Sequence, residues 1–252
     1  MVERRLGRRG PMVSAIGFGA FKIGRNEKTK YDAPYELPDE GQAARLLNEL
    51  LDLGISFIDT APAYGRSEER IGAAIGHRRR EFTLSTKVGE TFASGVSSYD
   101  FSRQAIEASV HRSLARLRSD VLDFVFLHCG DDDLAILQDT DAVATLLTLR
   151  ERGLTRGIGL SAKTVAGAQA ALAWADAVMV EYHLEDTSQH TVIAAAATAG
   201  VGVVVKKGLG SGKLPPADAI RFVLAHPGVS TLLVGSLSAG HMRDNVAAAS
   251  KV

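Results

Sequence analysis

Four polar residues stand at or just beyond the ends of three short apolar runs, and their side chains suit acid–base chemistry. Asp59 and Tyr64 lie in DTAPAYG (59–65), Lys87 ends STK, and His128 ends DFVFLH. A phenol, whose ordinary pKa is about 10, can give a proton to an oxygen that gains negative charge, and a nearby cation lowers that pKa. Asp59 can pair with Lys87, and His128 can donate to the same oxygen. The set predicts reduction of a carbonyl, with the hydride carried by a cofactor.

Each of these residues also has a purely structural explanation. His128 could be a hydrogen-bonded residue at a strand end, and Lys87 could be a surface charge. Asp59 could belong to a turn or cap, and Tyr64 could be an ordinary loop aromatic. Their order, at the ends of consecutive apolar runs, is what favours a shared site.

The elements that must position these side chains are short apolar runs rich in β-branched residues. Because they lack polar alternation, they are typical of parallel strands buried on both faces. Eight strands are predicted, at 14–20, 55–61, 82–88, 121–129, 155–162, 177–182, 201–207 and 231–236.

Between the strands lie segments with the apolar spacing of amphipathic helices. Asp141, Thr164 and Ser238 are suitable N-caps, and Gly153 and Gly200 can end helices. The predicted helices span about 39–54, 67–76, 102–118, 141–152, 164–174, 187–199, 216–225 and 239–249.

Strands that alternate with helices fit either a closed barrel or a doubly wound sheet. The run Gly17-Phe18-Gly19-Ala20 lacks the third glycine that a dinucleotide-binding turn of the doubly wound fold needs. We therefore predict one (β/α)8 TIM barrel domain over 1–252, in which the carboxyl ends of all strands meet at one mouth. The insertion at 24–39 follows the first strand on that side, as either a lid or a disordered surface loop.

Composition excludes several classes of partner. Lysine plus arginine (29) equal aspartate plus glutamate (29), and the basic runs are short and scattered. We therefore expect no nucleic acid or membrane partner, but a small-molecule carbonyl or alcohol, and a monomer or weak homo-oligomer. The single cysteine, Cys129, excludes an intrachain disulfide and favours the cytoplasm, and no signal peptide or membrane span is predicted. No metal site is predicted.

Several longer segments resemble the aldo-keto reductases in order and spacing. They are RRLGRRGPMVSAIGFGAFKIG, FIDTAPAYGRSEERIG, STKVG, DFVFLHCG, GIGLSAKT and MRDNVAAA, and the resemblance covers nearly the whole chain. It implies an oxidoreductase that interconverts a carbonyl (aldehyde, ketone or sugar lactol) and an alcohol with NADP(H) or NAD(H). By this resemblance Asp59, Tyr64, Lys87 and His128 match the family's catalytic residues, with Tyr64 as the general acid.

The cofactor residues that the resemblance implies carry over less completely. Ser161 keeps half of a serine-asparagine pair that holds the nicotinamide carboxamide, because Ala162 follows it, and Glu181 stands in place of a glutamine. Lys206 falls where an aromatic residue or an arginine commonly stacks on the nicotinamide. The loop KKGLGSGKL (206–214) resembles the pyrophosphate-binding loop, through Lys206, Lys207, Leu209 and Ser211.

Two departures concern the 2′-phosphate of NADP. Gly235 and His241 occupy positions where the family often has a lysine and an arginine, and a neutral histidine is a poor substitute for a bidentate guanidinium. Preference between NAD and NADP is therefore open. The resemblance still leaves three polar residues available to ribose, phosphate or adenine, namely Ser236, Ser238 and Asn245.

The substrate is not identified by the sequence. Ala20, Phe21 and Tyr64 are expected to shape the pocket, which should be open because the chain ends right after its last helix. Glu181, if ionised, would favour the oxidised nicotinamide, whereas a protonated or averted Glu181 would not. Two other functions remain alternatives, a cofactor-binding regulatory barrel and a barrel diverted to non-redox dehydratase or isomerase chemistry.

Overall fold

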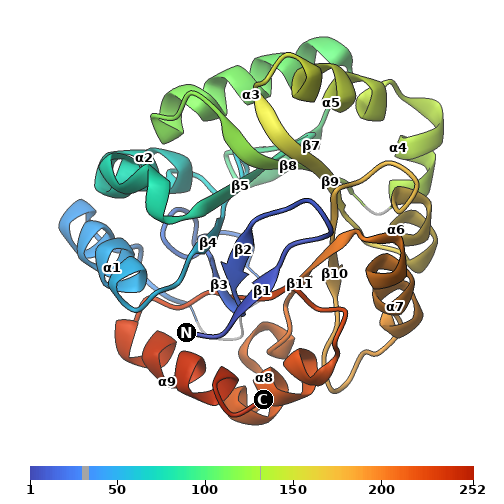
Figure 1. The fold of residues 1–252 in the computed structure, drawn as a ribbon. Helices are drawn as coiled ribbons and strands as arrows, with labels where there is room; N and C mark the ends of the chain where they lie inside the picture. The colour runs from blue at the N-terminus through green and yellow to red at the C-terminus, as the bar shows by residue number, and fades with distance from the viewer. Residues whose placement is uncertain (30–33, 131) are drawn as a thin grey trace.

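Eight strands close into a parallel barrel in a computed structural model that describes residues 1–29, 34–130 and 132–252. The strand order around the barrel is β10-β11-β12-β3-β4-β5-β8-β9, so the barrel prediction is confirmed over the doubly wound sheet. Figure 1 looks along the barrel and shows the helices forming an outer ring. The barrel strands are β3 (Ile16–Gly19), β4 (Phe57–Asp59), β5 (Thr83–Val88), β8 (Leu122–His128), β9 (Thr155–Ser161), β10 (Ala177–Glu181), β11 (Gly202–Lys206) and β12 (Thr231–Val234).

Apolar residues on both faces of the strands explain why the sequence runs lack polar alternation. Along β8, Phe124 and Phe126 belong to a compact inner cluster, whereas Val125 and Leu127 belong to the large core shared with the helices. Side chains at alternate strand positions point to opposite faces. At the level of Phe124 and Phe126 the barrel interior is therefore filled by apolar side chains. The predicted catalytic residues lie further along, at or near the carboxyl ends of the strands.

The predicted helices are confirmed, with ends that shift by up to three residues. Asp39 forms a capping box with Gln42, and Thr164 and Ser238 accept the cap hydrogen bonds expected of them. The prediction that Asp141 caps a helix is wrong, because the Asp141 side chain makes no cap hydrogen bond. The Thr140 hydroxyl accepts from the Ala142 amide instead. These helices are α1 (Glu40–Asp52), α2 (Ser67–Ile75), α3 (Arg103–Leu117), α5 (Ala142–Glu151), α6 (Val165–Ala171), α7 (His190–Ala199), α8 (Pro216–Ala225) and α9 (Ala239–Ala249).

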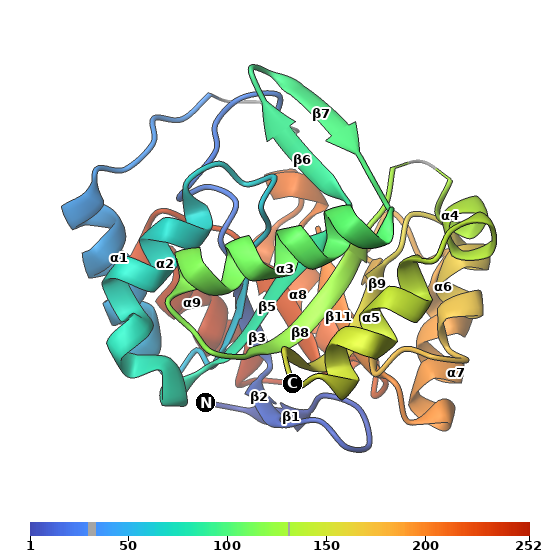
Figure 2. The same cartoon turned by 90° about the horizontal axis from the view of Figure 1, so that it is seen from above.

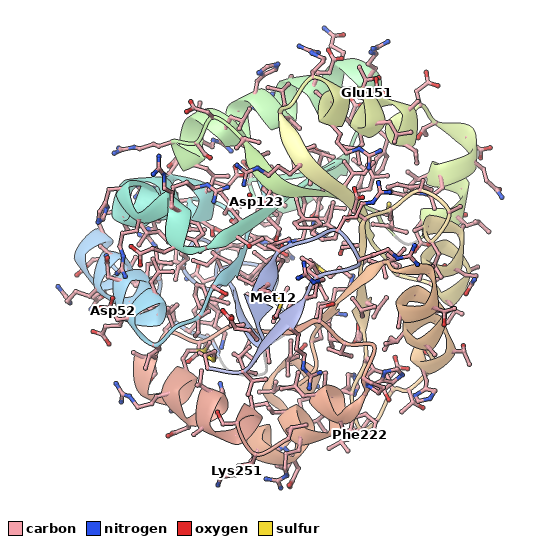
Figure 3. The ribbon with its side chains drawn as sticks, in the orientation of Figure 1. Met12, Asp52, Asp123, Glu151, Phe222 and Lys251 are labelled. Atoms are coloured by element: carbon pink, nitrogen blue, oxygen red, sulfur yellow. The ribbon has the colours of Figure 1, made fainter. Side chains whose placement is uncertain are left out.

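The structure adds short elements that the sequence did not indicate. Two antiparallel hairpins lie at opposite ends of the barrel (Figure 2), with β1–β2 at the end where strands begin and β6–β7 above the end where they finish. Figure 3 shows Met12, on the first hairpin, in front of the barrel centre. The added elements are β1 (Glu3–Arg5), β2 (Met12–Ser14), β6 (Glu90–Ala93), β7 (Val96–Tyr99), α4 (Asp133–Asp139), and the 3-10 turns η1 (Gly76–Glu81) and η2 (Gly210–Gly212).

The insertion at 24–39 is described at both of its ends. The Tyr35 hydroxyl donates to the Arg25 carbonyl, and the Asn26 amide donates to the Tyr35 carbonyl at 3.2 Å. Residues 30–33 of the predicted lid lie outside the described residues. Among the residues described, no helix has the length and apolar character needed to cross a membrane.

Candidate active site

A buried ion pair lies at the carboxyl ends of two neighbouring strands, β4 and β5. Lys87 Nζ donates to Asp59 Oδ2 at 2.6 Å and to the Thr60 carbonyl at 2.8 Å, and the Lys87 side chain is only 1% exposed. The other Asp59 oxygen accepts from Ser85 Oγ at 2.7 Å. Burial alone would lower the pKa of Lys87, but Asp59 and Tyr64 outweigh it and raise that pKa above its ordinary value. Lys87 is therefore a fixed cation at neutral pH.

Tyr64 lies beside this pair, in the loop between β4 and α2. The Lys87 ammonium is 4.7 Å from the centre of the Tyr64 ring, and the His128 ring centre is 6.1 Å from it at a near-perpendicular angle. Burial raises the pKa of Tyr64, and Lys87 offsets only part of that increase. The expectation that the cation brings the pKa of Tyr64 below its ordinary value is thus wrong in net direction, and the phenol stays protonated at neutral pH.

His128 ends β8, and one of its ring nitrogens lies close to a carboxylate. Glu90 Oε2, on β6, lies 2.9 Å from His128 Nδ1, and Glu90 also accepts from Ser97 Oγ at 2.6 Å. Burial alone would raise the pKa of Glu90, but His128, Ser97 and Arg25 outweigh it and hold the pKa at about 2. Burial lowers the pKa of His128 despite the opposing effect of Glu90. Nδ1 thus lies close to a carboxylate, although the pair does not meet the geometry of a hydrogen bond, and Nε2 is the ring nitrogen left for other partners.

A cavity of about 350 Å³ opens at this end of the barrel and brings most of the predicted residues together. Lys87 lies beneath its wall and is not part of the lining. The predicted residues that line it are Phe21, Asp59, Tyr64, His128, Ser161, Lys206, Lys207, Leu209, Ser211 and Gly235. Those outside the lining are Ala20, Glu181, Ser236, Ser238, His241 and Asn245.

The prediction that Ala20 shapes the pocket does not hold. Ala20 is fully buried; its amide donates to the Asp59 carbonyl at 2.8 Å and its carbonyl accepts from Ser67 Oγ at 2.8 Å. These bonds fix the loop after β3 against the loop after β4. Phe21, the next residue, does line the cavity, with its ring centre 5.1 Å from that of Tyr64.

Across the cavity from Tyr64, Lys206 ends β11 and reaches the end of β9. Its ammonium donates to Ser161 Oγ at 3.0 Å and to the Ala162 carbonyl at 2.7 Å. Burial, together with the neighbouring cations Lys163, Lys207 and Lys87, lowers the pKa of Lys206 to about 7, and Glu181 opposes this decrease. Lys206 is therefore poised to change charge near neutral pH, which a sequence comparison cannot show.

Glu181 ends β10 beside this lysine. It accepts a hydrogen bond from the Lys207 ammonium, and His183 Nε2 lies 3.5 Å away. Burial alone would raise the pKa of Glu181, but Lys207 outweighs it and lowers that pKa. Of the two alternatives for Glu181, the structure supports the ionised form. Because Lys207 compensates its charge, the predicted preference for an oxidised nicotinamide is weakened.

The residues predicted near the adenine end surround the start of α9. Ser238 Oγ accepts from the His241 amide at 3.3 Å, and the Ser238 amide donates to Ser236 Oγ at 3.1 Å. The His241 side chain is exposed, whereas Asn245 is buried against Met242. Of this set only Gly235 lines the cavity; the others lie in the loop after β12 and on α9.

Sequence reasoning missed several residues of the cavity wall. Glu90 follows β5 in a polar segment, Arg25 and Lys28 lie in the irregular segment after β3, and Lys163 follows β9. The one available signal was their position just after a barrel strand, which is where active-site residues of such barrels come from.

A larger cleft, of about 920 Å³, lies at the opposite end of the barrel. It is lined by Arg9 of the first hairpin loop and by residues that precede or start strands, including Thr83, Val121 and Arg156. None of the four residues of the predicted catalytic set lines it, so its size alone does not make it the reactive site.

Comparison with known proteins agrees with this geometry. A sequence model of the Aldo/keto reductase family matches residues 15–218. The chain belongs to this family. A crystal structure assigned to an aldo-keto reductase from Pseudomonas aeruginosa superposes with a TM-score of 0.91 at 40% identity, covering 99% of this chain and 94% of that one. As a member of the family, this aldo-keto reductase is an NAD(P)-dependent oxidoreductase.

Two curated relatives extend the comparison. L-galactose dehydrogenase from Arabidopsis thaliana is 27% identical over 99% of this aldo-keto reductase and 88% of its own length. An uncharacterized oxidoreductase of Bacillus subtilis, YqkF, is 33% identical over 64% of this chain, and that match spans 49% of YqkF.

Proposed function

We propose that this aldo-keto reductase interconverts a carbonyl (aldehyde, ketone or sugar lactol) and an alcohol by hydride transfer, with Tyr64 as general acid and base. The observation that carries the proposal is the convergence of Tyr64, His128 and the buried Lys87–Asp59 pair on one cavity. A relative named L-galactose dehydrogenase supports a sugar lactol as one substrate class.

Each residue of this set has a distinct role in the proposal. Tyr64 gives its proton to the carbonyl oxygen during reduction and takes it back during oxidation. The Lys87 cation stabilises the negative charge that grows on the phenol as the proton leaves, and Asp59 keeps Lys87 in place. Because the Glu90 carboxylate can only accept, the neutral His128 ring carries its proton on Nδ1 and offers Nε2 as an acceptor to the hydroxyl of an alcohol; only the imidazolium form would donate from Nε2 to the carbonyl oxygen.

The residues opposite Tyr64 fit a nicotinamide dinucleotide, which when bound supplies or accepts the hydride. Ser161 and Lys206 present polar groups at the cavity wall, where a carboxamide needs them. In the loop after β11, a side-chain atom added at Gly212 would meet nothing within 4 Å, so the backbone there is open to a phosphate. Lys207, Leu209, Ser211, Gly235, Ser236, Ser238, His241 and Asn245 would hold the rest of the cofactor.

Binding and turnover together test the proposed function. NADPH, NADH, NADP and NAD are titrated by fluorescence or calorimetry, and oxidation of the reduced forms is followed with generic aldehydes. We expect binding of at least one cofactor pair and turnover of an aldehyde. Binding without turnover of any aldehyde or alcohol would point to the regulatory barrel, and absence of binding would point to non-redox chemistry.

Restoring the missing cations should change cofactor preference. We expect Gly235→Lys combined with His241→Arg to shift affinity towards NADP by more than about tenfold, or ~1.4 kcal/mol, because a lysine and a bidentate guanidinium would meet the 2′-phosphate. Dissociation constants of NADP and NAD in both proteins measure the shift. An unchanged ratio would mean that the 2′-phosphate, if bound, is recognised elsewhere.

Lys206 should make cofactor preference depend on pH. Because its pKa is about 7, the Lys206 side chain changes from a neutral amine to an ammonium as pH falls from 8.5 to 6. The cations Lys163, Lys207 and Lys87 and the anion Glu181 act on it. A positive charge there opposes the oxidised nicotinamide. Two like charges ~4 Å apart at an effective dielectric of ~20 repel by about 4 kcal/mol. A third of this repulsion, acting on the bound oxidised cofactor, is enough to weaken its affinity about tenfold.

We therefore expect the oxidised cofactor to lose affinity relative to the reduced one by roughly tenfold on acidification from pH 8.5 to 6. Calorimetric dissociation constants for both forms at each pH provide the measurement. The variant Lys206→Met is the control and should show a flat ratio. A pH dependence that survives in Lys206→Met would assign the effect to another group.

A further inference from the structure

The cavity wall carries more positive than negative charge. Among the described residues that line it, two are acidic, Asp59 and Glu90, and both are already engaged, by Lys87 and by His128 with Ser97. The basic residues of the lining are Lys22, Arg25, Lys28, Lys163, Lys206 and Lys207.

These basic residues fall into two groups along the rim, and β12 lies between them. Lys163, Lys206 and Lys207 follow or end β9 and β11, the half of the barrel where the residues proposed for the cofactor lie. The other three follow β3, which adjoins β4, the strand that precedes Tyr64. We define Lys22, Arg25 and Lys28 as the β3 basic cluster. Because β3 lies between β12 and β4, the place of the cluster in the barrel does not by itself separate it from the proposed cofactor phosphates; Arg25 is the member that faces the Tyr64 side, because its guanidinium lies over the Phe92 ring of β6 and donates to the Ala63 carbonyl in the loop that carries Tyr64.

Arg25 is the most firmly held member of this cluster. Its guanidinium carbon lies 3.3 Å from the centre of the Phe92 ring and 5.4 Å from that of Phe21, so it is placed between the second hairpin and the wall of the cavity. Its Nε and Nη1 donate to the Glu27 and Ala63 carbonyls at 2.9 and 3.2 Å. Both acceptors are neutral, so these bonds orient the guanidinium without cancelling its charge.

The Arg25 guanidinium is partly desolvated, and the Glu90 carboxylate near it is already engaged by His128 and Ser97. Burial lowers the pKa of Arg25, with Glu90 and Tyr64 opposing, and burial also lowers the pKa of Lys22. Partly desolvated cations that sit in a cavity are stabilised by an anion that enters it. Phe21 links Arg25 to Tyr64, since its ring contacts both. An anion held by Arg25 would thus lie across the Phe21 side chain from the phenol.

We propose that the substrate of this aldo-keto reductase is an anionic carbonyl compound, and that Arg25, with Lys22 and Lys28, binds its carboxylate or phosphate while the carbonyl faces Tyr64. The inference rests on the proposed function and names its substrate class. A guanidinium suits either anion, because its parallel N–H donors match carboxylate and phosphate geometry.

Two matched pairs of aldehydes test this substrate class on the full chain with its preferred cofactor. Succinic semialdehyde is compared with butyraldehyde, which has the same number of carbons without the charge, and glyceraldehyde 3-phosphate with glyceraldehyde. Within a pair we expect kcat/KM for the anionic member to be higher by about 10- to 100-fold, the range of hydrogen bonds to charged groups. The pair with the larger ratio distinguishes carboxylate from phosphate.

Variants of Arg25 test whether this residue causes the preference for anionic aldehydes. In Arg25→Gln the ratio should fall to within about threefold of unity, mainly through KM for the anionic member, and Arg25→Lys should restore part of it. Arg103→Gln is the matched control, because Arg103 is an exposed arginine on α3, ion-paired to Glu107 and outside the cavity lining. Its ratio should equal that of the native protein. Circular dichroism and cofactor affinity confirm that each variant is folded.

The outcomes separate this inference from the function on which it rests. If no aldehyde, charged or neutral, is turned over with any nicotinamide cofactor, the proposed function fails. If neutral aldehydes are turned over as well as their anionic partners, the proposed function stands and the anionic substrate class is overturned. If the anionic aldehydes are preferred but Arg25→Gln and Arg103→Gln alter the ratio equally, the assignment of the anion site to Arg25 is overturned.

Discussion

Replacement of Tyr64 by phenylalanine is expected to lower kcat for carbonyl reduction by about 100- to 10,000-fold, the range typical of a lost general acid. The phenol combines a proton at neutral pH with a neighbouring cation, since burial raises its pKa and the Lys87 ammonium lies 4.7 Å from its ring centre. Phenylalanine keeps the ring, and with it the contact to Phe21. Cofactor affinity should therefore change little.

The control for this experiment is the same chemical change at a distance from the cavity. Tyr182, which directly follows β10, is buried outside the cavity lining and its hydroxyl lies 3.1 Å from His190 Nδ1. Tyr182→Phe should retain near-native kcat. Steady-state rates with a common aldehyde measure both variants. Near-native turnover by Tyr64→Phe would show that the proton comes from elsewhere, and the proposed mechanism would be wrong.

The sequence predicted which residues meet at the site wherever the course of the backbone alone determines their position. In a parallel barrel every strand delivers its carboxyl end to one mouth, so polar residues at strand ends must converge. Asp59 and His128 end β4 and β8, and Lys87 is the last residue but one of β5; in the structure Asp59 and His128 line the same cavity and Lys87 is paired with Asp59.

The parts that were missed depend on quantities that no sequence pattern contains. Glu90 and Arg25 lie in polar segments without apolar periodicity, and their places follow from a short hairpin that folds back over the barrel mouth. The pKa directions of Tyr64 and Lys206 depend on how far burial outweighs neighbouring charges, which needs three-dimensional packing. Ala20 was misplaced for a similar reason, because adjacent residues after a strand point in different directions.

Removal of one partner of the Lys87–Asp59 pair should destabilise the whole fold. In Asp59→Ala the Lys87 ammonium, 1% exposed and 2.6 Å from Asp59 in the native structure, would keep the Thr60 carbonyl and the Tyr64 hydroxyl as hydrogen-bond partners but would lose its counterion. A buried charge left without its counterion costs about 3–5 kcal/mol in the free energy of unfolding. Urea unfolding followed by circular dichroism measures this change.

The double variant Asp59→Leu with Lys87→Met distinguishes an uncompensated charge from simple loss of packing. Replacement of both partners by apolar side chains of similar volume is often neutral or stabilising, because the cost of desolvating two charges is removed together with their attraction. We therefore expect the double variant to be more stable than Asp59→Ala although it is inactive, since the cation beside Tyr64 is gone. If the double variant unfolds as readily as Asp59→Ala, the pair matters to the fold through shape, and the argument from buried charge fails. If it is stable and inactive, the ion pair is retained at this site for chemistry at a cost in desolvation.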